Sequence, residues 1–263
     1  MSRRARKAEA FRALHAGEAF VIPNPWDAGS ARVLAALGFC ALASTSSGFA
    51  FTLGRLDGGV TLDEVVEHAA ALDRATDLPL SVDLENGYGH DPEDAALAIT
   101  RVAEAGAVGG SIEDYDGSGG LYELDHAVAR IAAAVEAARG LAFPFTLTAR
   151  AENHIRGNPD LRDTIARLQA FEEAGADVLY APGLRTGEEI RAVCEAVSRP
   201  VNVLARPGLS LAEVVAAGAR RVSVGGGLTW VAASAMAAAA REIAAGDFSS
   251  LGESLPLGEW LAP

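Results

Sequence analysis

Short apolar runs alternate with amphipathic stretches along most of the chain. The apolar runs are typical of buried parallel strands, and the amphipathic stretches predict helices. The predicted strands span residues 19–23, 39–43, 80–84, 108–112, 144–149, 177–181, 201–204 and 221–224. The predicted helices span residues 27–37, 63–76, 91–105, 124–139, 160–174, 188–197, 211–217 and 230–245. This alternation predicts an α/β fold with a parallel sheet.

Three Ala-Gly pairs, which end at Gly106, Gly175 and Gly218, fall at the same point of this pattern. Each lies between a predicted helix and the next strand, where glycine ends helices. About eight strand-helix units in a chain of this length are typical of a (β/α)8 TIM barrel. A doubly wound sheet is the competing architecture, but no G-x-G-x-x-G follows the first predicted strand. We therefore expect residues 1–263 to form a single (β/α)8 barrel domain.

Composition and charge narrow the classes of partner. The chain has 263 residues, of which half are hydrophobic, and a net charge of -13. Such acidity argues against a nucleic-acid partner and gives no support for binding to anionic membranes. No apolar run is as long as a membrane span. The two cysteines have no metal-binding spacing, and the N-terminal stretch lacks the apolar core of a signal peptide, so we expect a cytoplasmic protein.

Two acidic residues mark the end of the third predicted strand. Asp83 and Glu85 lie two positions apart, so their side chains would point to the same side of a strand. Neighbouring carboxylates repel each other unless a cation lies between them, and Mg²⁺ prefers oxygen ligands of this kind. We expect Mg²⁺ here, with Mn²⁺ as the alternative ion. An acidic turn that only caps the next helix is the competing interpretation.

The next two strand ends also carry charged residues. Glu113 and Asp114 end the fourth predicted strand, and Arg150 follows the fifth. In a barrel of this type the chemistry lies at the carboxyl ends of the strands, and an arginine there can bind an anionic substrate. An internal salt-bridge network is the competing interpretation. The pattern predicts a metal-dependent barrel enzyme with a small carboxylate substrate. A Schiff-base aldolase is excluded because the only lysine, Lys7, lies outside any strand end.

Six short segments give the chain a resemblance to the isocitrate lyase/phosphoenolpyruvate mutase superfamily. They are residues 23–28, 45–48, 53–57, 83–89, 111–114 and 148–150. The resemblance runs from about Pro23 to about Ala240. It implies a (β/α)8 barrel, dependence on Mg²⁺, and substrates that are 2-oxo acids or enolpyruvyl compounds.

The resemblance also implies roles for the acids at the strand ends. Asp83 resembles the direct ligand of the metal. Glu85 and Glu113 resemble acids that hold the metal's water molecules. Asp57 resembles another acid of the same shell, and we take it as a candidate catalytic residue together with Arg150.

Further residues resemble the part of the site that binds the substrate. Trp26 and the backbone amides of Ser46, Ser47 and Gly48 resemble a cradle for the substrate carboxylate. Arg150 resembles the residue that neutralises the developing enolate, and therefore also contacts the substrate.

The chain departs from the isocitrate-type lyases of this superfamily in one loop. Those enzymes carry Lys-Lys-Cys-Gly-His after the Glu-Asp pair, whereas residues 115–121 read Tyr-Asp-Gly-Ser-Gly-Gly-Leu. The acid/base thiol is absent, so isocitrate and methylisocitrate are predicted to be poor substrates. We expect lyase- or decarboxylase-type C–C cleavage of a small 2-oxo or enolpyruvyl acid through an enolate. The alternatives are a phosphonomutase or phosphonate hydrolase, and a non-catalytic binding protein that retains the metal site.

The C-terminal part of the chain predicts an association between subunits. Residues 229–263 comprise an alanine-rich helix and an apolar tail without helical periodicity. The superfamily packs its last helix against a neighbouring barrel. We therefore expect these residues to pack on a neighbouring subunit, and the protein to be a homo-oligomer, most simply a tetramer.

Overall fold

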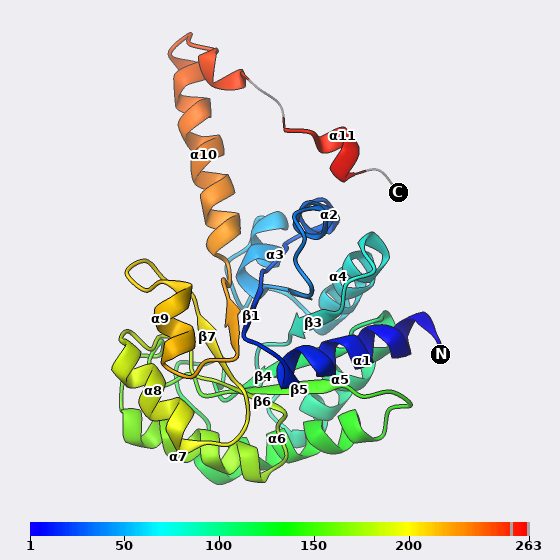
Figure 1. The fold of residues 1–263 in the computed structure, drawn as a ribbon, viewed down its shortest axis with the longest axis vertical. Coiled ribbons are helices and arrows are strands. Elements are labelled where there is room, and N and C mark those ends of the chain that lie inside the picture. Colours follow the sequence, from blue (N-terminus) through cyan, green and yellow to red (C-terminus); the bar gives the residue numbers. More distant parts are fainter. Residues whose placement is uncertain (253–254, 262–263) are drawn as a thin grey trace.

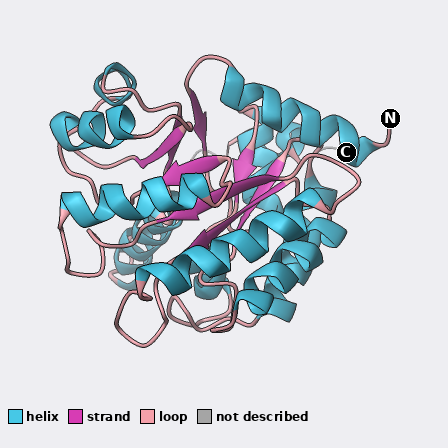
Figure 2. Ribbon diagram, turned by 90° about the horizontal axis from the view of Figure 1, so that it is seen from below, coloured by secondary structure: helices cyan, strands magenta, loops and turns pink. Residues whose placement is uncertain are grey.

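Eight parallel strands lie inside a ring of helices in the computed structural model (Figures 1 and 2), which describes residues 1–252 and 255–261. The strands are β1 (Phe20–Ile22), β2 (Leu42–Ala43), β3 (Leu80–Asp83), β4 (Gly109–Glu113), β5 (Thr146–Arg150), β6 (Val178–Tyr180), β7 (Val201–Leu204) and β8 (Arg221–Ser223). Each predicted strand therefore overlaps an observed one. The predicted α/β barrel is confirmed.

The strand order closes the sheet almost completely. Neighbouring strands follow the order β1-β8-β7-β6-β5-β4-β3-β2, and all pairs are parallel. β1 and β2 meet at the seam, where the Ala43 amide donates to the Pro23 carbonyl over 3.1 Å. This arrangement brings all carboxyl ends of the strands to one rim, which is where barrel enzymes place their sites.

Helices accompany the strands, and several of them begin at a residue whose side chain caps the helix. The helices are α1 (Arg3–Ala16), α2 (Ala28–Ala36), α3 (Ser46–Thr52), α4 (Leu62–Ala75), α5 (Pro92–Ala105), α6 (Leu124–Arg139), α7 (Leu161–Glu173), α8 (Gly187–Ala196), α9 (Leu211–Ala216), α10 (Gly227–Ala244) and α11 (Leu257–Trp260). Thr61, Thr186 and Ser210 each form a capping box with a glutamate three residues later. The local sequence thus fixes where α4, α8 and α9 start.

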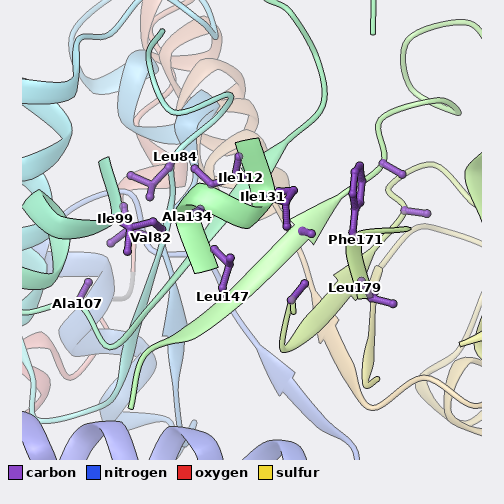
Figure 3. Packing of buried hydrophobic residues seen from close by; sticks show 14 of the residues in the cluster. Val82, Leu84, Ile99, Ala107, Ile112, Ile131, Ala134, Leu147, Phe171 and Leu179 are labelled. Carbon is purple, nitrogen blue, oxygen red and sulfur yellow. The ribbon is translucent and has the colours of Figure 1, made fainter. Parts of the chain in front are cut away.

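The main hydrophobic core lies between the strands and the helices (Figure 3). Val82 and Leu147 point outward from their strands and pack toward Ile99 and Ile131 of the covering helices. Side chains alternate along a strand, so the neighbours of these outward-pointing residues in each strand point into the barrel. The inward-pointing residues are mostly polar.

A second, smaller core closes the amino-terminal end of the barrel. Phe11 of α1 packs there with Ile22 and Val108. Its ring leaves no room at Gly109, where an added Cβ would lie 2.6 Å from the Phe11 ring. The barrel is therefore plugged at this end and open at the other.

Residues 45–48 lie outside the strands and helices predicted from the sequence. In the structure Ser46 begins α3, and the Thr45 side chain accepts from the Gly48 amide at the start of this helix. Serine and glycine have low helix propensity, so this short helix depends on the burial of Gly48 and Ala50 rather than on its composition.

α10 extends away from the barrel (Figure 1), and only Thr229 within it is buried. Apolar side chains along this segment are exposed, among them Val231 and Met236 at 67% and 64%. The chain then returns toward α2, where Arg32 donates to the Leu261 carbonyl over 2.6 Å. Packing of residues 229–263 on a neighbouring subunit stays a prediction, and its residues 253–254 and 262–263 lie outside the described residues. No helix among the described residues is long and apolar enough to cross a membrane.

Candidate active site

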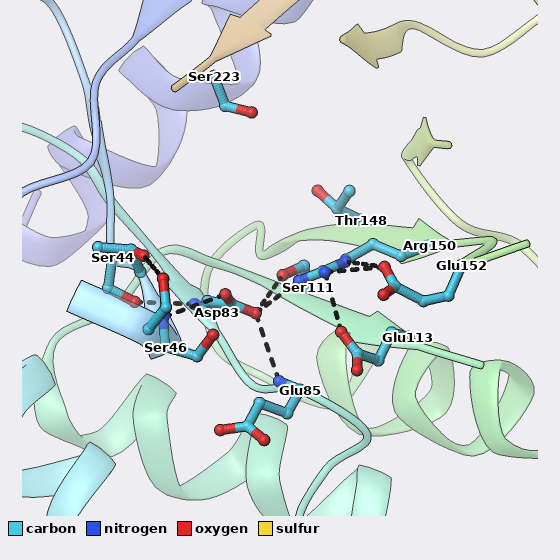
Figure 4. Close-up of polar contacts among 12 residues, drawn as sticks. Ser44, Ser46, Asp83, Glu85, Ser111, Glu113, Thr148, Arg150, Glu152 and Ser223 are labelled. Carbon is cyan, nitrogen blue, oxygen red and sulfur yellow. Dashed lines mark hydrogen bonds and ion pairs between the residues drawn. The ribbon is translucent and has the colours of Figure 1, made fainter. Parts of the chain in front are cut away.

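Arg150 occupies the centre of a charged cluster at the open end of the barrel (Figure 4). Its guanidinium lies 2.8 Å from Asp83 Oδ1, 2.9 Å from Glu113 Oε2 and 2.8 Å from Glu152 Oε1. Although burial opposes its charge, Glu152, Glu113 and Asp83 raise the pKa of Arg150 well above its usual value. The arginine is therefore permanently charged and held in one orientation.

Strand register explains why these groups meet. β3, β4 and β5 are adjacent, and Glu113 is paired with Arg150 while Asp83 is paired with Ser111. The Ser111 hydroxyl donates to Asp83 Oδ1 over 3.5 Å. The sequence prediction rested only on the carboxyl ends of parallel strands meeting at one rim, and the structure brings Asp83, Glu113 and Arg150 together there.

Glu85 lies beside this cluster without an ion-pair partner among the described residues. Its backbone adopts a φ of 47°, a left-handed conformation that is uncommon outside glycine. Tyr88 Oη donates to its carboxylate over 3.5 Å. Burial, followed by the charges of Asp83 and Asp57, raises the pKa of Glu85 to about 7. Burial likewise raises the pKa of Glu113. The rim thus carries more carboxyl groups than its two arginines, Arg150 and Arg156, can balance.

This donor set suits a hard divalent cation that keeps most of its water. Within the described residues no three His, Cys, Asp or Glu side chains are close enough together to hold an ion by themselves. Mg²⁺ in proteins usually binds one or two carboxylates and retains several waters. Asp83 with Glu85 and Glu113 at longer range fits that requirement. A cation bound beside them would lower the raised pKa of Glu85 again.

Two hollows share lining residues at the cluster. The inner one has a volume of about 150 Å³ and is lined by Ser46, Ser47, Asp83 and Arg150 together with residues of the barrel interior. The outer one has a volume of about 680 Å³, and Glu85, Glu113 and the loop after β4 line it. Asp57 and Arg150 border both. A small ligand can therefore contact the acids and the arginine at once.

The start of α3 forms one wall of the inner hollow. The Ser46 amide donates to Asp83 Oδ2 over 3.2 Å, and the Gly48 amide donates to Thr45 Oγ1 over 3.3 Å. Two of the three amides expected to cradle a carboxylate are thus bonded within the chain. A Cβ on Gly48 would lie 2.6 Å from Thr229 Oγ1, so only glycine permits this packing.

Trp26 lies behind α3 rather than in either hollow. A Cβ on Gly48 would come within 3.1 Å of its Cβ, and its carbonyl oxygen lies 3.1 Å from His68 Nε2. The residues that line the two hollows do not include it. Of the predicted site residues, Trp26 and Gly48 are the two that line neither hollow.

No role was assigned from the sequence to two charged residues of the cluster. Glu152 is fully buried and binds Arg150, and Arg156 lies 3.3 Å from Glu113 and over the Tyr115 ring at 3.6 Å. A signal existed for Glu152, because it follows Arg150 by two positions at the same strand end. Nothing in the sequence pattern locates Arg156, which lies in a loop.

An eight-stranded parallel barrel with charged residues at its carboxyl rim is the architecture of the barrel enzymes. Comparison with known proteins specifies the family: the model for phosphoenolpyruvate phosphomutase matches residues 11–244. The chain belongs to the phosphoenolpyruvate mutase/isocitrate lyase superfamily, as the resemblance predicted.

Individual relatives agree with this assignment. An uncharacterized protein of Mycobacterium tuberculosis (strain ATCC 25618 / H37Rv) is 33% identical over 247 residues, which cover 93% of this chain and 92% of that protein. A crystal structure from Burkholderia cenocepacia J2315, described provisionally as a lyase or mutase, is 52% identical with a TM-score of 0.96 and coverage of 99% and 97%. The oxaloacetate decarboxylase of Paraburkholderia xenovorans (strain LB400) is 36% identical over 160 residues, covering 56% of this chain and 50% of that enzyme.

Proposed function

We propose that the protein is a Mg²⁺-dependent enzyme that cleaves a C–C bond of a small 2-oxo or enolpyruvyl acid through an enolate, in the manner of a lyase or decarboxylase. The observation that carries this proposal is the fixed guanidinium of Arg150, held by Asp83, Glu113 and Glu152 at the wall of the inner hollow. Names among the relatives, which include oxaloacetate decarboxylases and a 2-methylisocitrate lyase, support this class of substrate.

In this proposal Asp83 is the direct ligand of the metal, and Glu85 and Glu113 hold its water molecules. When bound, the ion supplies Lewis-acid polarisation of a keto oxygen. Ser46 holds Asp83 in place, since its amide donates to Asp83 Oδ2. Asp57 borders both hollows and adds a further acid to the same shell.

Arg150 acts on the charge that develops during the reaction. As the bond at the carbon next to the keto group breaks, its electron pair moves toward the keto oxygen. Asp83, Glu113 and Glu152 already hold the guanidinium of Arg150 in place. Arg150 can therefore stabilise the charge on the keto oxygen with little reorganisation of the site. In a decarboxylation, CO₂ departs and a proton is added to the carbon that lost it.

The size of the inner hollow favours a small substrate. Its volume of about 150 Å³ is comparable with that of an engineered protein cavity that accommodates benzene. A three- or four-carbon acid is of this size.

A phosphonomutase or phosphonate hydrolase is the second candidate. The family model that matches the chain is that of phosphoenolpyruvate phosphomutase, which favours it. Arg156 at the outer hollow offers a second cation for a phosphonyl group, although Glu113 and Glu152 already neutralise it.

A product screen with Mg²⁺ tests the proposal. Oxaloacetate, other 2-oxo acids, methylisocitrate and phosphonopyruvate are incubated with the protein, and pyruvate, CO₂ and phosphate are measured. Because oxaloacetate loses CO₂ slowly on its own, buffer without protein and the Arg150→Met variant are the controls. Pyruvate formed faster than in both controls supports the proposal. Turnover of phosphonopyruvate alone supports the second candidate, and binding without turnover of any acid indicates a binding protein.

A further inference from the structure

Arg221 carries a charge inside the barrel that no acid in the described part of the chain balances. It begins β8, is only 5% exposed, and points into the barrel interior. Its Nε donates to Asn202 Oδ1 over 2.8 Å, and its Nη2 donates to Thr148 Oγ1 over 2.9 Å. Its Nη1 lies 3.2 Å from His15 Nε2. Arg150, by contrast, is held by three carboxylates.

The titratable groups near Arg221 are neutral at physiological pH. Burial, and then the charge of Arg221, lowers the pKa of His15 to about 3, and its Nδ1 faces the Phe11 carbonyl at 2.8 Å. The neutral ring therefore donates from Nδ1 and accepts at Nε2 from Arg221. Burial also raises the pKa of Tyr180 to about 12, so its phenol stays protonated. Burial lowers the pKa of Arg221 to about 10, which still leaves it charged.

A buried charge without an opposite charge is costly, because neutral dipoles replace its hydration only in part. The cost falls when an anion binds beside it. Among the described residues no carboxylate fulfils this role, since Tyr180 is the only acidic group that affects the pKa of Arg221.

The position of Arg221 makes it accessible to a ligand. It lines the floor of the inner hollow, together with Ser81, Asn202 and Ser223, while Asp83 and Arg150 line the same hollow. Of its five N–H groups, three have the partners given above. One N–H on each terminal nitrogen remains without a partner in the described part of the chain, which is the pair that a carboxylate can accept from.

We propose that Arg221 is an anion subsite for a second carboxylate of the substrate, at the end of the inner hollow away from the solvent. The assignment rests on the proposed function and specifies its substrate as a small dicarboxylate whose 2-oxo end lies at Asp83 and Arg150. In a four-carbon 2-oxo diacid this second carboxylate is the group that a decarboxylation releases as CO₂. Arg221 therefore contributes to the binding and selection of the diacid, whereas Arg150 stabilises the charge that develops at the keto oxygen.

Binding of two analogues with the same 2-oxo end tests the subsite. Pyruvate has one carboxylate and 3,3-difluorooxaloacetate has two. Their Kd values are measured by calorimetry with Mg²⁺ on the wild type, Arg221→Met, Arg221→Lys and the control Arg139→Met. Arg139 lies at the amino-terminal end of the barrel and binds Asp177 instead. Arg221→Met should weaken the diacid by roughly 10- to 100-fold, as expected for a lost charged hydrogen bond, and pyruvate by less than about 3-fold.

Arg221→Lys should restore part of the preference for the diacid, and Arg139→Met should leave it unchanged. Equal weakening of both analogues in Arg221→Met, or of neither, overturns the subsite. If Arg221→Met does not fold, the wild type alone decides: nitrate should compete with the diacid and not with pyruvate, and equal competition overturns the assignment. An Arg221-dependent preference without turnover in the product screen would contradict the proposed function and leave the subsite standing.

Discussion

Replacing Glu85 with glutamine should stabilise the metal-free protein at and above neutral pH. Burial, then Asp83 and Asp57, raises the pKa of Glu85 from 4.5 to about 7. The folded protein therefore binds more protons at this group than the unfolded chain does between these values. Stability then falls as the pH rises through this window, and the whole cost is present above about pH 7. A glutamine has a similar shape and no charge to bury.

The magnitude follows from the pKa. A rise from 4.5 to about 7 corresponds to about 3 kcal/mol at most, and solvent in the outer hollow reduces this to ~1–2 kcal/mol. For a domain of this size, 1 kcal/mol changes the Tm by about 2–4 °C. Glu85→Gln should thus raise the Tm at pH 8 by roughly 2–8 °C, and by less at pH 5.5, where the folded carboxyl is already protonated.

Thermal unfolding in EDTA at both pH values measures this, with Glu67→Gln at an exposed site of α4 as the control. Mg²⁺ should stabilise the wild type more than Glu85→Gln, because a bound cation favours the carboxylate. A Glu85→Gln protein no more stable than the wild type at pH 8 would refute the reasoning, as would an equal gain in the control.

Three further predictions concern the metal, the assembly and the substrate. Asp83→Ala should abolish Mg²⁺-dependent turnover. The far-UV circular dichroism should stay unchanged, because Asp83 lies at a strand end outside the hydrophobic core, and retained turnover would contradict its role as a metal ligand. Light scattering at micromolar concentration should give a tetramer, and Met236→Glu on the exposed side of α10 should weaken it; a monomeric wild type would contradict the packing of 229–263 on a neighbour. Methylisocitrate should be a poor substrate, since residues 115–121 supply no thiol and the inner hollow is small. Cleavage of methylisocitrate at about 10 per second would show that the missing thiol does not limit the reaction.

The barrel could be predicted because its signals are local. Apolar strands, capped helices and helix-ending glycines each depend on a few neighbouring residues. Gly106, for example, has a φ of 118° at the end of α5, and an added Cβ would lie 2.5 Å from Asp73 Cγ. The start of α3 could not be predicted in this way. Ser46 and Gly48 become helical because α3 packs on the rim and against Thr229, which is distant in sequence.

The predicted part of the site consists of residues that end strands, because parallel strands align their carboxyl ends whatever their exact register. Asp83, Glu113 and Arg150 meet for that reason. Trp26 was predicted to bind substrate by resemblance alone, and the structure places it behind α3. A family resemblance suggests a role for a residue, but one sequence does not show in which direction its side chain points.

Arg221 shows what a closer analysis of the strands could have found. In β8 it alternates with Val222 and precedes Ser223, so the arginine and the serine share one face and the valine the other. In the neighbouring strand Asn202 lies between Val201 and Val203 in the same way. Helices cover the outside of a barrel, so the valines of these strands must face outward and the polar residues inward. Alternation within a buried strand therefore identifies the residues that can reach a ligand inside the barrel, even at the end opposite to the rim.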